Sequence, residues 1–181
     1  MTTSKMLATG AALAALVLPS AAVADSTSPD STTPSASQQC KTLRTQMGTK
    51  AFGEAYGTNA NRANAFGKCV SKLSTAQDAG KTQAVKVCRA EQAADEAAFT
   101  AKYGTGKKGA NAYGKCVSGK AKAAAQQAKA AELNASKACK AERAADPKAF
   151  VAKYATNAKR TNAFGKCVSA KAKAKVAAPA A

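Results

Sequence analysis

Bulky apolar residues are sparse along this chain, and they recur between long stretches rich in alanine and lysine. One clear example places Phe150 and Tyr154 four residues apart, directly after Asp146-Pro147. Alanine and lysine favour helices, Asp before Pro is typical of a helix start, and residues four apart share a helix face. The pattern predicts a long helix that ends, a short helix, a loop, and a new long helix capped by Asn162.

This arrangement occurs three times. Each copy carries a Phe-x-x-x-Tyr pair and then an Asn-Ala-Phe/Tyr-Gly-Lys-Cys-Val-Ser motif, which begins at Asn64, Asn111 and Asn162. The two cysteines of a copy are 28 or 29 residues apart, and the copies recur about every 50 residues, which is typical of repeat architectures. The chain therefore uses one supersecondary unit three times. We term the segment between the two cysteines of a copy a knuckle.

We predict an all-α fold of antiparallel long helices joined by three short-helix knuckles. The longer helices are expected near residues 38–47, 66–92, 112–144 and 164–176. Gly80 is expected to break or kink the second of them. Antiparallel packing places the first and third knuckles at one end and the second at the other. An extended array of partly separated units is the alternative, because few large residues link the units.

The aromatic residues are the bulkiest side chains available to fill the knuckles. Stacking on a ligand is the other use of such residues beside basic ones, but we expect them in the core. They form one trio per copy: Phe52, Tyr56 and Phe66; Phe99, Tyr103 and Tyr113; Phe150, Tyr154 and Phe164.

Six cysteines offset this thin core. No Cys-x-x-Cys pair and no histidine is present, which argues against redox catalysis and zinc binding. Cys116 and Cys139 fall on one predicted helix, roughly 34 Å apart, beyond the limit of about 7 Å for a bridge. We therefore predict structural disulfides within each copy, each worth about 3–4 kcal/mol in the loop-closure model. The predicted pairs are Cys40–Cys69, Cys88–Cys116 and Cys139–Cys167.

The N-terminal residues are typical of a processing segment. Lys5 precedes an apolar run, Leu7 to Leu18, and a small-residue stretch that ends at Ala24. This is the pattern of a secretory signal peptide, and the run is too short for a transmembrane anchor. We expect a secreted or cell-wall-associated protein. Its expected parts are a signal peptide (1–24), a Ser/Thr/Pro-rich linker (25–39), a three-repeat disulfide-stapled domain (40–170) and a mobile Lys/Ala/Pro tail (171–181).

Charge narrows the range of functions. The chain has 28 Lys and Arg against 10 Asp and Glu, a net charge of +18, and no histidine. No nucleophile–base pair or metal constellation can be assembled, so we expect a non-enzymatic protein with no catalytic residue, metal, cofactor or small-molecule substrate. The pairs Glu91/Asp95 and Glu142/Asp146 could contribute calcium ligands. Helix capping by the aspartates explains them better, because the first copy has Leu43 at the glutamate position.

The basic residues are the candidate binding groups. They recur in each loop and at each following helix start, where free backbone N–H groups also favour anions. The predicted polyanion-binding residues are Arg62, Lys68, Lys107, Lys108, Lys115, Lys159, Arg160 and Lys166. The expected partner of an exported chain is an anionic polymer of the cell envelope. Nucleic acid, such as extracellular DNA, is an alternative, and so is a protein partner with incidental charge.

The repeat from about Cys40 to Lys171, with its Phe-x-x-x-Tyr pair and Asn-Ala-Phe-Gly-Lys-Cys-Val-Ser motif, resembles one in uncharacterised exported proteins of high-GC actinobacteria. The resemblance implies export and a repeated module. It implies no activity and no site residues.

Overall fold

The computed structural model describes residues 33–105 and 107–177, and this part of the chain is all-helical. The predicted fold class is therefore confirmed. Seven α-helices and one 3₁₀ turn follow one another in the described residues: α1 (Ala36–Met47), α2 (Thr49–Tyr56), α3 (Ala65–Ala94), α4 (Glu96–Tyr103), η1 (Lys107–Gly109), α5 (Ala112–Ala145), α6 (Pro147–Tyr154) and α7 (Ala163–Ala177).

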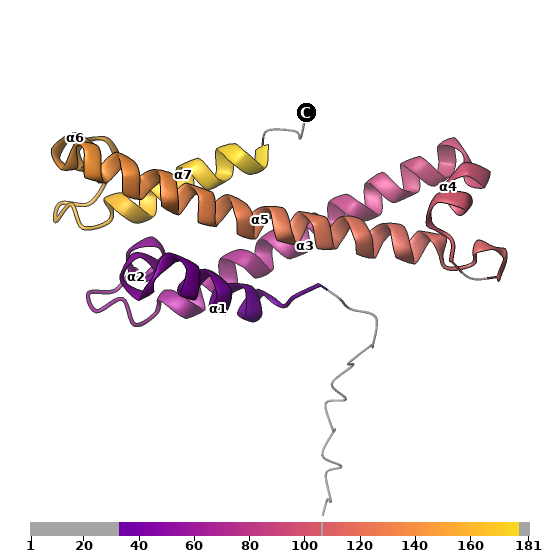
Figure 1. Ribbon diagram of the computed structural model, residues 1–181, viewed down its shortest axis with the longest axis horizontal. Coiled ribbons are helices and arrows are strands. Elements are labelled where there is room, and N and C mark those ends of the chain that lie inside the picture. The colour runs from indigo at the N-terminus through magenta and orange to yellow at the C-terminus, as the bar shows by residue number, and fades with distance from the viewer. Residues whose placement is uncertain (1–32, 106, 178–181) are drawn as a thin grey trace, which may run out of the picture.

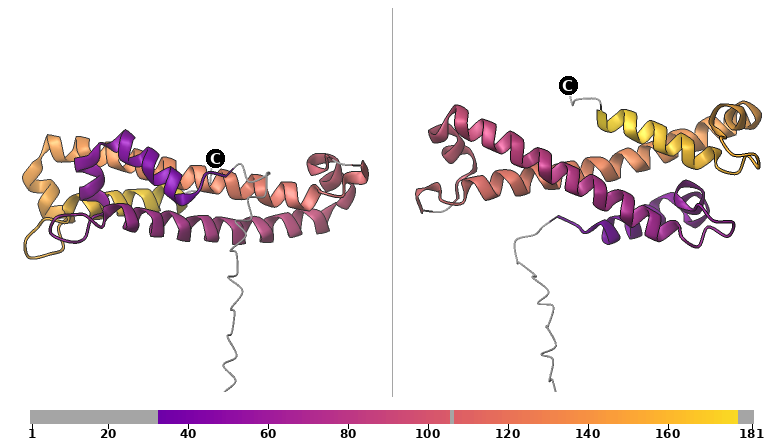
Figure 2. Two further views of the ribbon diagram at one scale, coloured as in Figure 1. Left: turned by 90° about the horizontal axis from the view of Figure 1, so that it is seen from below. Right: turned by 180° about the vertical axis from the view of Figure 1, so that it is seen from behind.

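The two longest helices, α3 and α5, run antiparallel and cross each other near their middles (Figure 1). The first and third knuckles, with α2 and α6, lie together at one end, and the second knuckle, with α4, lies at the opposite end. The shorter helices α1 and α7 flank the crossing pair at the shared end, as the two further views show (Figure 2). The arrangement matches the antiparallel prediction rather than the extended alternative.

Helix α3 continues through Gly80, so the prediction of a break there is wrong. A Cβ atom at Gly80 would lie 2.7 Å from the Cβ of Ala124 on α5. The glycine therefore permits the close approach of the two long helices where they cross, and this gain in packing outweighs its low helix propensity.

All three predicted disulfides are present. They join α1 to α3, α3 to α5 and α5 to α7, with Cα–Cα distances of 6.0, 6.0 and 6.1 Å. Cys116 and Cys139 both lie on α5, but Cys116 bonds to Cys88 on α3 and Cys139 bonds to Cys167 on α7. The second and third disulfides thus join the end of one long helix to the start of the next, whereas Cys40 of the first lies in the first half of α1.

Side-chain caps begin several helices. The Asp95 and Asp146 carboxylates accept hydrogen bonds from the backbone N–H groups of Ala98 and Ala149, both at 2.9 Å, which confirms their predicted role as caps. Ser35 forms a capping box with Gln38. Helix α1 therefore begins at residue 36, inside the segment expected to be linker.

The motif asparagines do not cap helices through their side chains, contrary to the expectation for Asn162. Its Oδ1 accepts from the Thr156 backbone N–H at 3.1 Å, and its Nδ2 donates to Thr156 Oγ1 at 2.8 Å. The pairs Thr58–Asn64 and Thr105–Asn111 repeat this geometry. Each asparagine closes the preceding loop, because the threonine six residues earlier offers both a donor and an acceptor.

The helix predicted near residues 164–176 is present as α7, so residues 171–177 are helical and the expectation that 171–181 form a mobile tail is wrong for this part. Ala172 is buried, and Lys171 pairs with Glu142 at 3.1 Å. These contacts make the segment an integral helix rather than a mobile arm. The predicted signal peptide (1–24), the first part of the linker (25–32) and residues 178–181 lie outside the described residues.

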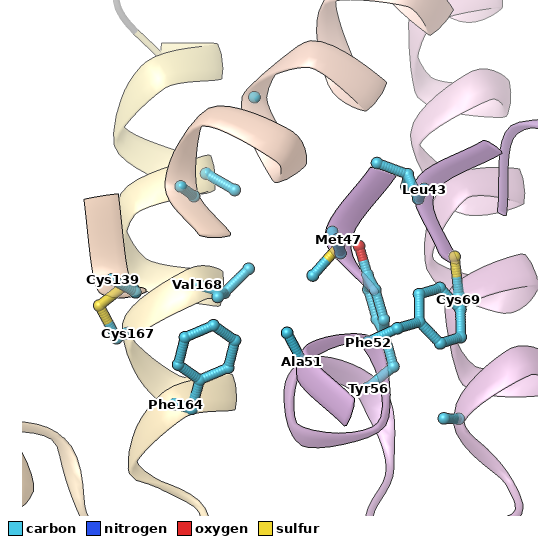
Figure 3. Packing of buried hydrophobic residues seen from close by; sticks show 14 of the residues in the cluster. Leu43, Met47, Ala51, Phe52, Tyr56, Cys69, Cys139, Phe164, Cys167 and Val168 are labelled. Atoms are coloured by element: carbon cyan, nitrogen blue, oxygen red, sulfur yellow. A yellow bond between two sulfur atoms is a disulfide. The ribbon is translucent and has the colours of Figure 1, made fainter. Parts of the chain in front are cut away.

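The main core lies where the first and third knuckles meet. Ala51 of α2 faces Phe164 and Val168 of α7 across it, while the Phe52 ring points away from them toward Cys69 of α3 (Figure 3). A smaller cluster around Phe99 fills the second knuckle. Every aromatic residue of the three trios belongs to one of these clusters or packs against it, which confirms their predicted place in the core.

Candidate functional site

A groove of about 710 Å³ lies at the shared end, between the loops of the first and third knuckles and the beginning of α7. Its walls carry cationic side chains from segments almost a hundred residues apart in sequence. The cations that line it are Arg62, Lys159, Lys166 and Lys173.

The groove exists because α7 begins close against the end of α2. A Cβ atom at Gly165 would lie 3.0 Å from the carbonyl oxygens of Glu54 and Ala55, so only glycine fits this approach without displacing the backbone. The equivalent glycines of the other two motifs, Gly67 and Gly114, have no such neighbour within 4 Å. One motif position therefore has a packing role only in the third copy, where two knuckles meet.

The loop that carries Arg62 is held in one conformation. Arg62 adopts a left-handed backbone with φ of 57°, and the equivalent Arg160 has φ of 52°. The second knuckle has Gly109 at this position, with φ of 67°. The Thr–Asn hydrogen bonds close each of these loops, so the arginines are held at fixed positions on the loop rather than on flexible chain.

One carboxylate, Glu54, is found among the described residues that line the groove, and two arginines neutralise it. Arg62 Nη1 lies 3.5 Å from Glu54, and Arg143 Nη1 donates to the other carboxylate oxygen at 2.7 Å. Lys159, Lys166 and Lys173 are exposed, and none of them makes an ion pair or hydrogen bond with another described residue. The groove is therefore strongly positive and its lysines are available to a ligand.

The eight basic residues predicted to bind a polyanion do not all lie in the groove. The structure brings Arg62, Lys159 and Lys166 into it. Lys68 is exposed on the first turn of α3, and Arg160 lines a separate shallow pocket beside α6. The other three belong to the opposite end of the molecule: Lys107, Lys108 and Lys115. The side chain of Lys107 lies outside the described part of the chain.

Lys173 is a groove residue that the sequence prediction missed, because the candidate residues were limited to the loops and the helix starts. A signal was present: Lys166, Ser169 and Lys173 follow the spacing of one helix face, and all three line the groove. Following this face along the helix predicted near 164–176 would have placed Lys173 on one helix face with Lys166.

Glu91 of the second knuckle and Glu142 of the third are each bound by internal partners. Glu91 accepts from Tyr103 at 2.7 Å and pairs with Lys120 at 2.8 Å. Glu142 pairs with Lys153 at 2.7 Å and accepts from the hydroxyl of Tyr154 at 3.1 Å.

These hydrogen bonds from lysine and tyrosine lower the carboxylate pKa values. The pKa of Glu142 falls from its ordinary 4.5 to about 2, chiefly through the hydrogen bonds from Lys153 and Lys171. The pKa of Glu91 is lowered through the bonds from Lys120 and Tyr103. These carboxylates therefore stabilise knuckles rather than face a ligand, and no group of three or more metal-ligating side chains occurs in residues 33–105 and 107–177.

The first knuckle replaces that ion pair with apolar residues. Leu43 and Leu73 are buried at the positions that Glu91 and Lys120 hold in the second knuckle. The Tyr56 hydroxyl donates instead to Glu132 of α5 at 2.9 Å, and Lys72 pairs with the same buried carboxylate at 2.6 Å. Burial, followed by the nearby Glu132 charge, raises the pKa of Tyr56 well above its usual range.

No protein-family model, curated protein or solved structure matches this chain. Three disulfides indicate an oxidising, extracytoplasmic compartment. Of the helices in the described ranges, none combines the length and the apolar character that crossing a membrane requires.

Proposed function

We propose that this protein is a non-enzymatic, exported binding protein that holds an anionic polymer of the cell envelope in the groove between its first and third knuckles. The observation that carries the proposal is the convergence of Arg62, Lys159, Lys166 and Lys173 on one groove whose single carboxylate, among the described lining residues, is already neutralised. The protein is then secreted or retained on the cell wall.

The distribution of charge supports a polymer rather than a small substrate. A groove with several free lysines can neutralise successive phosphate or carboxylate groups of one chain, whereas an isolated anion would leave most of them unpaired. The net charge of +18 adds long-range attraction to any polyanion. Because the lysines are exposed, their attraction is screened by salt over about 8 Å at physiological ionic strength.

The test is retention of the oxidised protein on purified cell envelope across a salt series. A variant with Lys159, Lys166 and Lys173 all changed to Glu is expected to elute at much lower salt than the wild type. The matched control changes Lys86, Lys137 and Lys148 to Glu, since these exposed lysines lie on α3, α5 and α6 away from the groove. The control has the same net charge as the groove variant, so any difference between the two reports the site.

Three outcomes would contradict the proposal. Equal weakening by both triple variants would mean that net charge alone drives retention. Retention that persists after the anionic polymers are stripped from the envelope would point to a protein partner. Retention on double-stranded DNA but not on envelope, measured on a parallel matrix, would favour nucleic acid as the ligand.

A further inference from the structure

A second groove, of about 630 Å³, lies between α3, α5 and α7. Its volume is within the roughly 300–1,000 Å³ of small-molecule sites. Its surface is mostly apolar, and its apolar lining comes from seven alanines and glycines together with Leu73, Val87 and Val176. Val176, at 52% exposure, is the one large apolar residue exposed in the described part of the chain, and it lies on this groove.

The apolar groove adjoins the cationic one. Lys173 lines both, and the polar groups between them are linked to each other. Lys72, which lines the apolar groove, donates to Ser169 of the cationic groove at 3.4 Å. Tyr56 of the cationic groove donates to Glu132 of the apolar one. The two grooves are therefore adjacent, with Lys173 on their shared border.

Of the three lysines that line the apolar groove in the described part of the chain, one is free to bind a negatively charged group of a ligand. Lys72 is neutralised by Glu132, and Lys120 by Glu91. Lys173 has no anionic partner in the described residues. The unneutralised charge thus lies at the end that meets the cationic groove.

We propose that the two grooves together bind one anionic lipid, with its phosphate at Lys173 and Lys166 and its acyl chain along the apolar groove. The proposal rests on the proposed function, and it names a lipid-linked anion as the form in which the ligand is held. A second copy of the chain is disfavoured as the occupant, because each copy carries a charge of +18. An acyl chain also needs no hydrogen-bond partners, which an alanine-lined groove does not offer to a peptide backbone.

The probes are lysophosphatidylglycerols of increasing acyl length, used below the concentration at which they form micelles and measured by titration calorimetry. Each added methylene that enters the groove is expected to raise affinity by up to about fourfold. Glycerophosphoglycerol, which is the same phosphodiester without its acyl chain, is expected to bind most weakly. Lysophosphatidylcholine of equal chain length tests the need for net negative charge and is expected to bind more weakly than the anionic lipid.

A second variant, the apolar-groove variant, changes Ala79 and Val176 to Asp, both exposed residues that line the apolar groove. The matched control changes Ala123 and Ala174 to Asp, which are exposed on α5 and α7 outside that lining. The apolar-groove variant is expected to lose the dependence of affinity on chain length, and the control is expected to keep it. Circular dichroism of both variants checks that helix content is unchanged.

Polyphosphate binding separates the failure of this inference from the failure of the proposed function. If polyphosphate binds to the cationic groove but affinity for the lipids is independent of chain length in the wild type, the lipid inference is wrong and the polyanion function stands. The lipid inference is also overturned if the apolar-groove variant and its control lose the dependence of affinity on chain length to the same extent. A dimer seen by sedimentation, and dissociated only by the apolar-groove variant, would assign the apolar groove to a second copy instead.

Discussion

The Tyr56 hydroxyl donates a 2.9 Å hydrogen bond to Glu132, a residue 76 positions further along the chain. In the second and third knuckles the corresponding tyrosine bonds a glutamate only 12 positions away, within the same knuckle. The first knuckle has Leu43 at the glutamate position, so its tyrosine finds a partner on α5. The tyrosine–glutamate hydrogen bond is thus local in two copies, whereas in the first copy it joins the knuckle to the central helix α5.

The change of Glu132 to Gln is expected to lower the free energy of unfolding by about 1–3 kcal/mol, because it weakens a buried hydrogen-bond network and leaves the Lys72 charge without its partner. Urea denaturation of the oxidised protein measures the effect. Asp78, exposed on α3, provides the control as Asp78→Asn. Equal stability of the two variants would contradict a structural role for the Tyr56–Glu132 pair.

Acid is expected to destabilise the third knuckle. The pKa of Glu142 is lowered to about 2 in the folded protein, so the unfolded chain takes up a proton at this site at higher pH than the folded one. The stabilisation is fully present above pH 4.5 and is lost as pH falls from 4.5 toward 2. Urea midpoints across this range should fall less steeply for Glu142→Gln than for the wild type. Identical slopes would exclude the contribution of this carboxylate.

The three disulfides are expected to differ in how far their loss spreads. Cys139 and Cys167 belong to the main core, and their double change to Ser should lower global stability by about 3–4 kcal/mol. Cys88 and Cys116 belong to the small cluster of the second knuckle. Their loss should raise hydrogen exchange mainly in α4 and the adjoining ends of α3 and α5. If each double variant instead raises hydrogen exchange equally throughout the helices, the two ends of the molecule unfold as one unit.

The change of Gly80 to Ala is expected to destabilise the protein even though alanine is the better helix former. The new methyl would lie 2.7 Å from Ala124, and overpacking of this kind costs about 1–3 kcal/mol. Gly119 on α5 provides the contrast, because a Cβ there meets nothing within 4 Å. Gly119→Ala should raise stability by about 0.5–1 kcal/mol. Thermal unfolding of both variants checks the opposite signs.

The repeat made the local structure predictable. Helix propensity, the Asp caps and the spacing of the Phe-x-x-x-Tyr pairs depend on residues close in sequence, so the knuckles and the disulfide pairing could be predicted without a fold. Three of the eight predicted cations, Arg62, Lys159 and Lys166, also proved to share one groove. The last helix was also predicted, but its end was wrongly expected to be mobile, since the basic composition gave no sign of the buried Ala172 or of the Lys171–Glu142 pair.

The sequence by itself determined that each unit is a disulfide-linked helical knuckle with basic loops. Only the tertiary structure decided which units meet. The close approach at Gly80 and at Gly165 depends on the positions of backbones far apart in the chain, and identical motif glycines at Gly67 and Gly114 meet nothing. The partner of Tyr56, and the position of Lys173 opposite the loop of the first knuckle, could likewise not be predicted from the sequence. Repeated sequence specifies the same local unit three times, whereas grooves form only where different units pack together.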